Sequence, residues 1–187
     1  SLTQKDVKGI LALSEKMDAV VIGPGLGAGT ATKTAVKNLL AHLKVPTVVD
    51  ASALLYTNSL PKTCVLTPHR GEFKNLTGDD PTPKNAQKWA KTMHATIVVK
   101  GPEDIVADKD ELSLNKAGNA LMTVGGTGDA LSGLIGGLMA QKMHPFDACK
   151  LAVKLMGQAG DHLAQKQGSL RAIDLVHAIP ALLHKDK

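Results

Sequence analysis

The sequence predicts an α/β protein: a three-layer sandwich in which helices cover both faces of a mainly parallel sheet. Two observations support this fold class. Strand patterns alternate with helical patterns along the chain, and the strands are apolar throughout, as in sheets that are buried on both faces. The 187 residues are enough for one domain with its own core. Because no repeat, low-complexity tract or linker divides them, we expect a single domain over residues 1–187.

Apolar runs that stop at glycine, proline or a charged residue predict four strands, at 18–22, 46–50, 64–68 and 95–101. Apolar residues three and four positions apart predict helices at about 30–43, with Thr30 as its N-cap, 85–94, from the glycine loop at 125–129 to 143, 145–165 and 173–184. Two further apolar runs, 105–107 and 112–114, could pair as a small hairpin. Right-handed crossovers would align the carboxyl ends of the strands along one edge, where such sheets bind ligands.

Composition narrows the class of partner. The net charge of +5 comes from scattered basic residues, which suit a small anionic ligand at least as well as DNA. Only 2% of the residues are aromatic, which argues against a base-stacking surface. Cys64 and Cys149 lie in apolar segments, which favours two buried reduced thiols over a disulfide. Signal-peptide, bilayer-spanning and metal-ligand patterns are absent from the sequence. We therefore expect a cytoplasmic protein that binds neither nucleic acid nor membranes.

Three unusual motifs each follow a predicted strand, so the same sheet edge should bring them together. GPGLG occupies 23–27, TPHRGE occupies 67–72 and KGPED occupies 100–104. GPGLG is either a glycine turn or a ligand-contacting loop. Pro24 lacks a backbone donor and the next helix starts late, so a dinucleotide-binding turn of the usual kind is disfavoured.

Single side chains at these strand ends are further candidates for ligand contact. Asp50 either caps a short helix or orients a substrate hydroxyl or a metal-bound water. His69 follows a proline stop and is expected to contact a ligand. Lys100 either reaches anionic ligand oxygens or is an ordinary surface lysine.

The most specific motif is GGTGD, at 125–129. Successive small residues leave backbone N–H groups free to converge on an anion at a helix start. Asp129 beside a bound phosphate could accept a proton as a general base, or it could simply cap the helix. The glycines that follow in the helix, at 133, 136 and 137, weaken it and suggest close approach of another backbone or a ligand. The spacing is not that of a Walker P-loop.

Taken in order, DAVVIGPGLG, VVDASAL, TPHRGEF, IVVKG, AGNALMTVGGTGDALSG and LAVKLMGQAGDHLA resemble the ADP/ATP-dependent NAD(P)H-hydrate dehydratases. That family is a branch of the ribokinase-like superfamily, and the resemblance covers nearly the whole chain. It implies repair of the 6-hydroxylated (hydrated) form of NADH or NADPH. In the reaction that the resemblance implies, ADP or ATP, with Mg²⁺ bridging its phosphates, would phosphorylate the substrate hydroxyl, and phosphate would then leave.

The resemblance also implies a role for each matching residue. Asp129 would be the catalytic base and would contact the substrate. Nucleotide would be held by the strand-end and glycine-loop segments, namely Lys100, Gly101, Pro102, Glu103, Asp104, Gly125, Gly126, Thr127 and Gly128. Hydrated substrate would be contacted by Gly25, Gly27, Asp50, His69 and Asn119 together with Asp129. No residue is predicted as a ligand of a resident metal.

The sequence departs from the family pattern at three places. Ser52 stands where the family usually has a second aspartate, and Arg70 stands where it usually has proline. Family members also begin well upstream of DAVVIGPGLG, so we expect a C-terminal fragment of a longer domain or a truncated one. Either would expose a sheet edge and favour a homo-oligomer, with a tetramer as one form. Two other functions stay open: a kinase of a small hydroxylated metabolite, of the hydroxymethylpyrimidine or hydroxyethylthiazole type, and an inactive nucleotide-binding domain.

Overall fold

Six strands form one sheet in the order β1-β2-β3-β4-β5-β6 in the computed structural model, which describes residues 1–27 and 29–183. Strands β1 to β4 run parallel, whereas β5 is antiparallel to both β4 and β6. The expected hairpin therefore forms, and it extends the main sheet. The strands are β1 (Val20–Ile22), β2 (Thr47–Val49), β3 (Cys64–Leu66), β4 (Thr96–Val99), β5 (Asp104–Ala107) and β6 (Leu112–Asn115).

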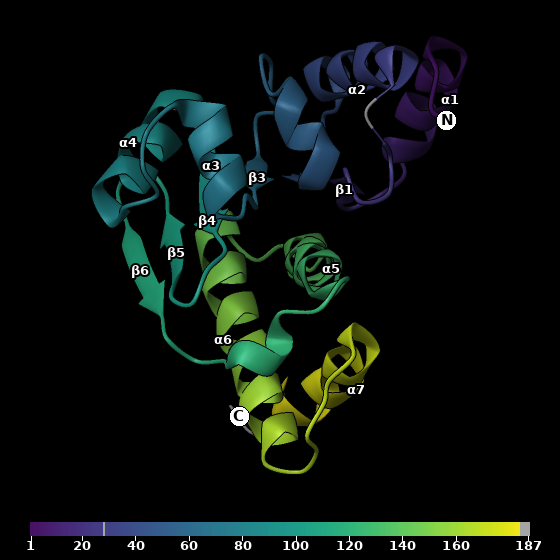
Figure 1. Cartoon of the computed structure of the whole chain (residues 1–187). Coiled ribbons are helices and arrows are strands. Elements are labelled where there is room, and N and C mark those ends of the chain that lie inside the picture. The colour runs from purple at the N-terminus through teal and green to yellow at the C-terminus, as the bar shows by residue number, and fades with distance from the viewer. Residues whose placement is uncertain (28, 184–187) are drawn as a thin grey trace.

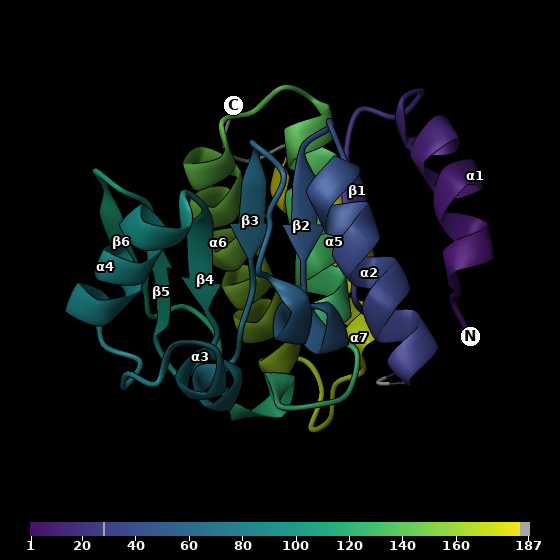
Figure 2. The ribbon, with the colours of Figure 1, turned by 90° about the horizontal axis from the view of Figure 1, so that it is seen from above.

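Helices cover both faces of this sheet, which confirms the three-layer architecture (Figures 1 and 2). One face carries α1 (Gln4–Ser14), α2 (Thr30–His42), the short 3₁₀ helix η1 (Ala51–Tyr56), α3 (Arg70–Thr77) and α4 (Pro83–Met93). The other face carries α5 (Thr127–Ala140), α6 (Pro145–Ala164) and α7 (Ala172–Leu183), and the 3₁₀ turn η2 (Ala120–Met122) precedes α5.

Alternate strand residues point into two separate cores. Val49 and Leu66 pack with the core under α2 and α3, whereas Val48 and Val65 pack with the core under α5 and α6, and all four are fully buried. A strand that is buried on both sides needs apolar residues at every position. This explains the uninterrupted apolar runs of the sequence.

Two helix starts near the N-terminus differ from the sequence expectation. Helix α1 was not predicted, although the Asp6 carboxylate accepts a hydrogen bond from the Thr3 backbone N–H at 2.8 Å, as in a capping box. Thr30 is the first residue of α2 and not its N-cap, which is Gly29. Both differences are local and leave the arrangement of the sheet unchanged.

The two cysteines are free and buried, as expected. Burial raises the pKa of the Cys64 thiol to about 12 and raises that of Cys149 as well, so neither thiol has the thiolate character of a reactive cysteine. Within the part of the chain that the structure describes, no helix is both long and apolar enough to cross a bilayer.

The glycines of α5 have different surroundings. A β-carbon on Gly136 would lie 2.6 Å from Cγ2 of Val21, so this glycine lets α5 pack closely against β1. Gly133 and Gly137 have no such neighbour within 4 Å. A close approach therefore occurs at one of the three positions, and there the neighbour is a valine side chain, not the other backbone that was expected.

Candidate functional site

A buried ionic cluster lies where β2 and β4 end. The Asp50 carboxylate, only 1% exposed, accepts a hydrogen bond from Nζ of Lys100 at 2.8 Å and another from Oγ of Ser132 at 2.5 Å. It also accepts one from the Ala51 backbone N–H at 2.8 Å and so caps η1. The structure confirms that Asp50 caps a short helix, and the same carboxylate also holds a lysine at the sheet edge.

The glycine loop lies directly beside this cluster. A β-carbon on Gly128 would lie 3.2 Å from Nζ of Lys100 and 3.9 Å from Oδ2 of Asp50. Gly126 is the N-cap of α5, with a φ of +90° that favours glycine, and no side chain caps this helix start. The backbone N–H groups of Gly128 and Asp129 lie in the first turn of α5, where the helix itself provides no carbonyl acceptor for them. An anion at this position would meet these N–H groups and the Lys100 ammonium together.

Asp129 is the third residue of α5, and it does not cap the helix because Gly126 occupies that position. Its side chain is exposed and accepts no hydrogen bond from the described part of the chain. A carboxylate at a helix start, without a structural partner, is available to a ligand.

Ser132 is a member of the cluster that sequence reasoning did not single out. Its hydroxyl lies 2.9 Å from the carbonyl oxygen of Gly128 and 3.4 Å from the hydroxyl of Thr67, in addition to its bond to Asp50. Ser132 lies one helical turn after Gly128 and hence on the same face of α5. That spacing in GGTGDALSG was the available signal.

The TPHRGE segment meets KGPED along the backbone. The Lys100 N–H donates to the Pro68 carbonyl at 2.8 Å, and His69 and Lys100 form a parallel bridge. Nδ1 of His69 accepts hydrogen bonds from the N–H groups of Gly71 and Glu72 at 3.0 and 3.1 Å, so His69 caps α3. Because Nδ1 acts as an acceptor, Nε2 carries the proton in the neutral ring. The side chain is 60% exposed, and Nε2 is left as a donor that lies 3.6 Å from the Glu72 carboxylate.

KGPED folds into a tight turn between β4 and β5. The Gly101 N–H donates to Oδ1 of Asp104 at 3.1 Å, and Asn115 donates to Oδ2 at 3.2 Å. Burial raises the pKa of Asp104, and these two hydrogen bonds oppose that shift. Glu103 pairs with Lys116 at 3.6 Å, away from the Asp50 cluster. Of the five predicted residues in this segment, the structure brings Lys100 to the cluster.

Asn119 is held by a second residue that sequence reasoning missed. Asp161 on α6 accepts hydrogen bonds from Nδ2 of Asn119 at 3.1 Å and from the Gly118 N–H at 3.0 Å. Gly157 and Gly160 allow α6 to approach this segment, which runs directly into the glycine loop. Asp161 lies in the quoted motif GQAGDHLA, but its partner is 42 residues away.

We expect Gly157→Ala to lower the free energy of unfolding by about 1–3 kcal/mol. The new β-carbon would lie 2.5 Å from the Ala117 carbonyl oxygen and 2.7 Å from the Ala117 β-carbon, so α6 and the segment must separate. Gly137→Ala is the matched control, because this helical glycine has nothing within 4 Å, and we expect a gain of up to about 1 kcal/mol. Urea unfolding measures both, and equal gains would contradict the assigned packing.

The GPGLG loop is anchored at its first residue. A β-carbon on Gly23 would overlap the Asp50 carbonyl oxygen, and the Ser52 hydroxyl donates to the Gly23 carbonyl at 3.2 Å. Gly25 and Gly27 have φ values of +72° and +71° and open space where a β-carbon would lie. The loop thus leaves the sheet edge beside Asp50, and among the described residues no hydrogen bond joins its later glycines to Asp129.

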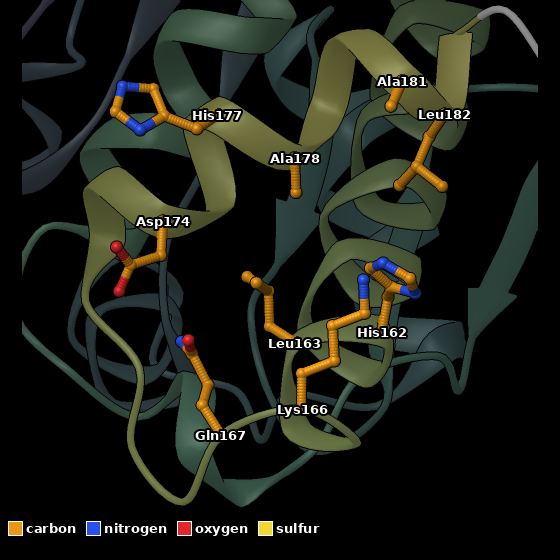
Figure 3. A pocket seen from close by; sticks show the side chains of 9 residues that line it. All are labelled: His162, Leu163, Lys166, Gln167, Asp174, His177, Ala178, Ala181 and Leu182. Atoms are coloured by element: carbon orange, nitrogen blue, oxygen red, sulfur yellow. The ribbon is translucent and has the colours of Figure 1, made fainter.

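Two hollows accompany these features. One, of about 320 Å³, lies between the end of α6 and α7 and is lined by His162, Lys166 and His177 among others (Figure 3). It shares no residue with the Asp50 cluster. The other, of about 520 Å³, lies between η1, α3 and α4 and includes Ala51 and Ser52, which directly follow Asp50. Among the described residues, no three or more His, Cys, Asp or Glu side chains gather as a metal site.

The amino-acid sequence is similar to that of known NAD(P)H-hydrate dehydratases over most of its length. A family model described as NAD(P)H-hydrate dehydratase matches residues 2–181. The bifunctional NAD(P)H-hydrate repair enzyme Nnr of Archaeoglobus fulgidus is 39% identical over 189 residues, which are 100% of this chain and 39% of that protein. The ADP-dependent (S)-NAD(P)H-hydrate dehydratase of Cenarchaeum symbiosum is 34% identical over 180 residues, 89% of this chain and 62% of the relative. The chain therefore spans well under half of the Nnr relative and less than two thirds of the other.

Solved structures agree with these relatives. The ADP/ATP-dependent NAD(P)H-hydrate dehydratase of Bacillus subtilis, co-crystallised with ATP/Mg²⁺, superposes with a TM-score of 0.82 at 31% identity, covering 91% of this chain and 65% of that one. A ribokinase-like superfamily protein of Enterococcus faecalis V583 gives a TM-score of 0.87 at 28% identity, over 97% of this chain and 68% of that one. Because the family model covers nearly all of the sequence, the chain belongs to the NAD(P)H-hydrate dehydratase family.

Proposed function

We propose that this chain catalyses the ADP- or ATP-dependent dehydration of hydrated NADH or NADPH to the dihydronicotinamide. One observation carries the proposal: the buried Asp50 holds the Lys100 ammonium beside Gly128, at the uncapped start of α5, next to the exposed carboxylate of Asp129. Family membership supports the same reaction, because the family model and the Cenarchaeum symbiosum relative are both described as NAD(P)H-hydrate dehydratases.

In this mechanism the terminal phosphate of the nucleotide lies at the start of α5. The backbone N–H groups of Gly128 and Asp129 and the Lys100 ammonium would stabilise the charge on its oxygens during transfer. Asp50 acts indirectly, because its two hydrogen bonds fix Lys100 and Ser132 under the loop. No reorganisation is then needed when the phosphoryl group moves.

Asp129 would accept the proton of the substrate hydroxyl. The freed oxygen attacks the terminal phosphorus, and the bond to the nucleotide leaving group breaks. The phosphorylated carbon then loses inorganic phosphate while the neighbouring ring carbon loses a proton, which restores the ring double bond. His69 presents its Nε2 donor from the adjacent strand end and would orient the dinucleotide.

The residues at this site are compatible with Mg²⁺. This ion is usually held by one or two carboxylates together with the phosphates of the nucleotide, and not by an all-protein cage. Because Asp129 serves as the base, water and the nucleotide phosphates would supply most of the ligands, and among the described residues no cluster of three or more His, Cys, Asp or Glu side chains competes for the ion. When bound, Mg²⁺ would neutralise charge on the transferring phosphate.

The test supplies hydrated NADH with ADP or with ATP and follows both the absorbance of the dihydronicotinamide and the release of phosphate. We expect the two signals to rise together. Consumption of nucleotide without recovery of NADH would instead indicate the kinase, and nucleotide binding without any turnover would indicate an inactive nucleotide-binding domain. Hydrated NADPH in place of hydrated NADH measures the preference between the two substrates.

We further propose that the chain acts in the cytoplasm as a homo-oligomer. Reduced, buried cysteines support a reducing compartment. Strand β1 is the outer strand of the described sheet, and its Val21 is 39% exposed, although natural proteins usually cover such edges. Light scattering at several protein concentrations tests the oligomer, and a monomer throughout would contradict it.

A further inference from the structure

The larger hollow, between η1, α3 and α4, has the dimensions of a small-ligand site. Its volume of about 520 Å³ falls within the usual range for such pockets. The residues that determine its chemistry are Ser52, Leu55, Glu72, Asn75, Trp89 and Met93. None of these residues has been assigned a role in the phosphoryl-transfer machinery.

This pocket adjoins both segments that are proposed to bind the substrate. The Ser52 hydroxyl donates to the carbonyl of Gly23, the first residue of GPGLG, at 3.2 Å. The Glu72 carboxylate accepts from the backbone N–H of His69 at 2.8 Å. Two residues that line the pocket are therefore hydrogen-bonded to the GPGLG loop and to the turn at His69.

The pocket and the glycine loop lie on opposite faces of the sheet edge. η1 and α3 lie on the same face of the sheet as α2 and α4, whereas α5 covers the opposite face (Figure 2). Asp50 lies between them, because Ala51 and Ser52 line the pocket and Oδ2 of Asp50 adjoins Gly128. A ligand with two ends can thus reach the pocket with one end and Asp129 with the other by crossing this edge.

The lining suits an uncharged aromatic ring that is attached to a hydroxylated group. Leu55 is 62% exposed, and Trp89 and Met93 are only partly buried, so apolar surface faces the hollow. Asn75 and Ser52 offer neutral hydrogen-bonding groups. No lysine or arginine lines the pocket in the described residues, and Glu72 would repel a phosphate there.

The lysine beside Trp89 is already paired. Nζ of Lys88 lies 5.4 Å from the centroid of the Trp89 ring and donates to Asp79 at 2.8 Å. The indole N–H of Trp89 donates to the same carboxylate, also at 2.8 Å. These contacts among Lys88, Asp79 and Trp89 fix the orientation of the indole ring and provide a partner for its N–H group. The part of the ring that faces the pocket is therefore apolar.

We propose that this pocket binds the adenosine end of the hydrated dinucleotide while the nicotinamide end reaches Asp129. The inference rests on the proposed function, because it takes the substrate to be a dinucleotide. The adenine ring packs against Leu55, Trp89 and Met93. The ribose hydroxyls bond to Asn75 and Glu72, in the way that acidic side chains bind ribose in other dinucleotide sites.

The first test needs no catalysis, because Trp89 is the only tryptophan of the chain. Its fluorescence is measured during titration with ADP-ribose and, separately, with nicotinamide mononucleotide, both in saturating non-hydrolysable ATP analogue to fill the glycine-loop site. We expect a saturable change with ADP-ribose and none with the mononucleotide. No change with ADP-ribose would overturn the proposal even if the enzyme is active. A change without any dehydratase activity would overturn the proposed function alone.

The second test uses Leu55→Asp, which places a charge on the apolar wall. We expect KM for hydrated NADH to rise about 10-fold, with KM for hydrated, reduced nicotinamide mononucleotide unchanged, because that substrate lacks the adenosine end. Leu114→Asp is the matched control, since Leu114 is also exposed but lies on β6, outside the pocket. Equal changes for both substrates, or a similar effect of Leu114→Asp, would overturn the assignment.

Discussion

Asp129→Asn is expected to lower the rate of dehydration by about 10²–10⁴-fold, the contribution of a positioned general base. Asn keeps the shape of the side chain and cannot accept the hydroxyl proton. The fold should be little affected, because Gly126 is the N-cap and the Asp129 side chain accepts no hydrogen bond from the described residues. Nucleotide binding should be unchanged or tighter, since one negative charge beside the phosphates is removed. Steady-state kinetics and nucleotide titration measure both effects.

Asp147→Asn is the matched control for this change. Asp147 is likewise exposed and is the third residue of its helix, α6, so its replacement removes the same favourable charge from a helix start. We expect similar small shifts in melting temperature for the two variants and a loss of turnover for Asp129→Asn alone. If Asp129→Asn lowered the melting temperature much more than the control and kept its activity, its role would be structural.

Local patterns were sufficient for most of the sheet. Strands β2 to β4 are buried on both faces and β1 is apolar although partly exposed, so each is a continuous apolar run that periodicity can detect. The rule that parallel strands share one carboxyl edge then correctly brings Lys100 and the glycine loop to Asp50. Helix α1 was missed although Thr3 and Asp6 form a recognisable capping pair and Val7, Ile10 and Leu11 recur at helical spacing, so this helix was within reach of local patterns.

The contacts that complete the site were beyond local patterns. Ser132 and Asp50 are 82 residues apart, and Asp161 and Asn119 are 42 apart, so no window of sequence contains both partners. A serine within a helix and an aspartate near a helix end are also compatible with ordinary solvated positions. Their roles follow from the packing of α5 and α6 against the sheet, which sequence periodicity does not specify.

The largest expected effect on stability is at Asp50. Asp50→Asn should lower the free energy of unfolding by about 3 kcal/mol, the lower end of the range for breaking a buried ion pair. Asp50 is 1% exposed, and the variant leaves the Lys100 ammonium without its anion. The loss stays at the lower end because the Lys100 side chain is 21% exposed and water can still solvate its charge. Glu15→Gln, which breaks the exposed pair between Glu15 and Lys44, is the control and should cause little measurable change.

A double-mutant cycle separates the ion pair from other effects of the Asp50 change. Asp50→Asn combined with Lys100→Gln removes both charges, and the pair of amides can hydrogen-bond across the same gap. We expect the double variant to be more stable than the sum of the single losses predicts, by at least about 1 kcal/mol. The same variants separate stability from catalysis, because losing Lys100 should raise KM for the nucleotide even at temperatures where the protein stays folded. Strict additivity in unfolding would mean that Asp50 stabilises the chain through Ser132 and the η1 cap and not through Lys100.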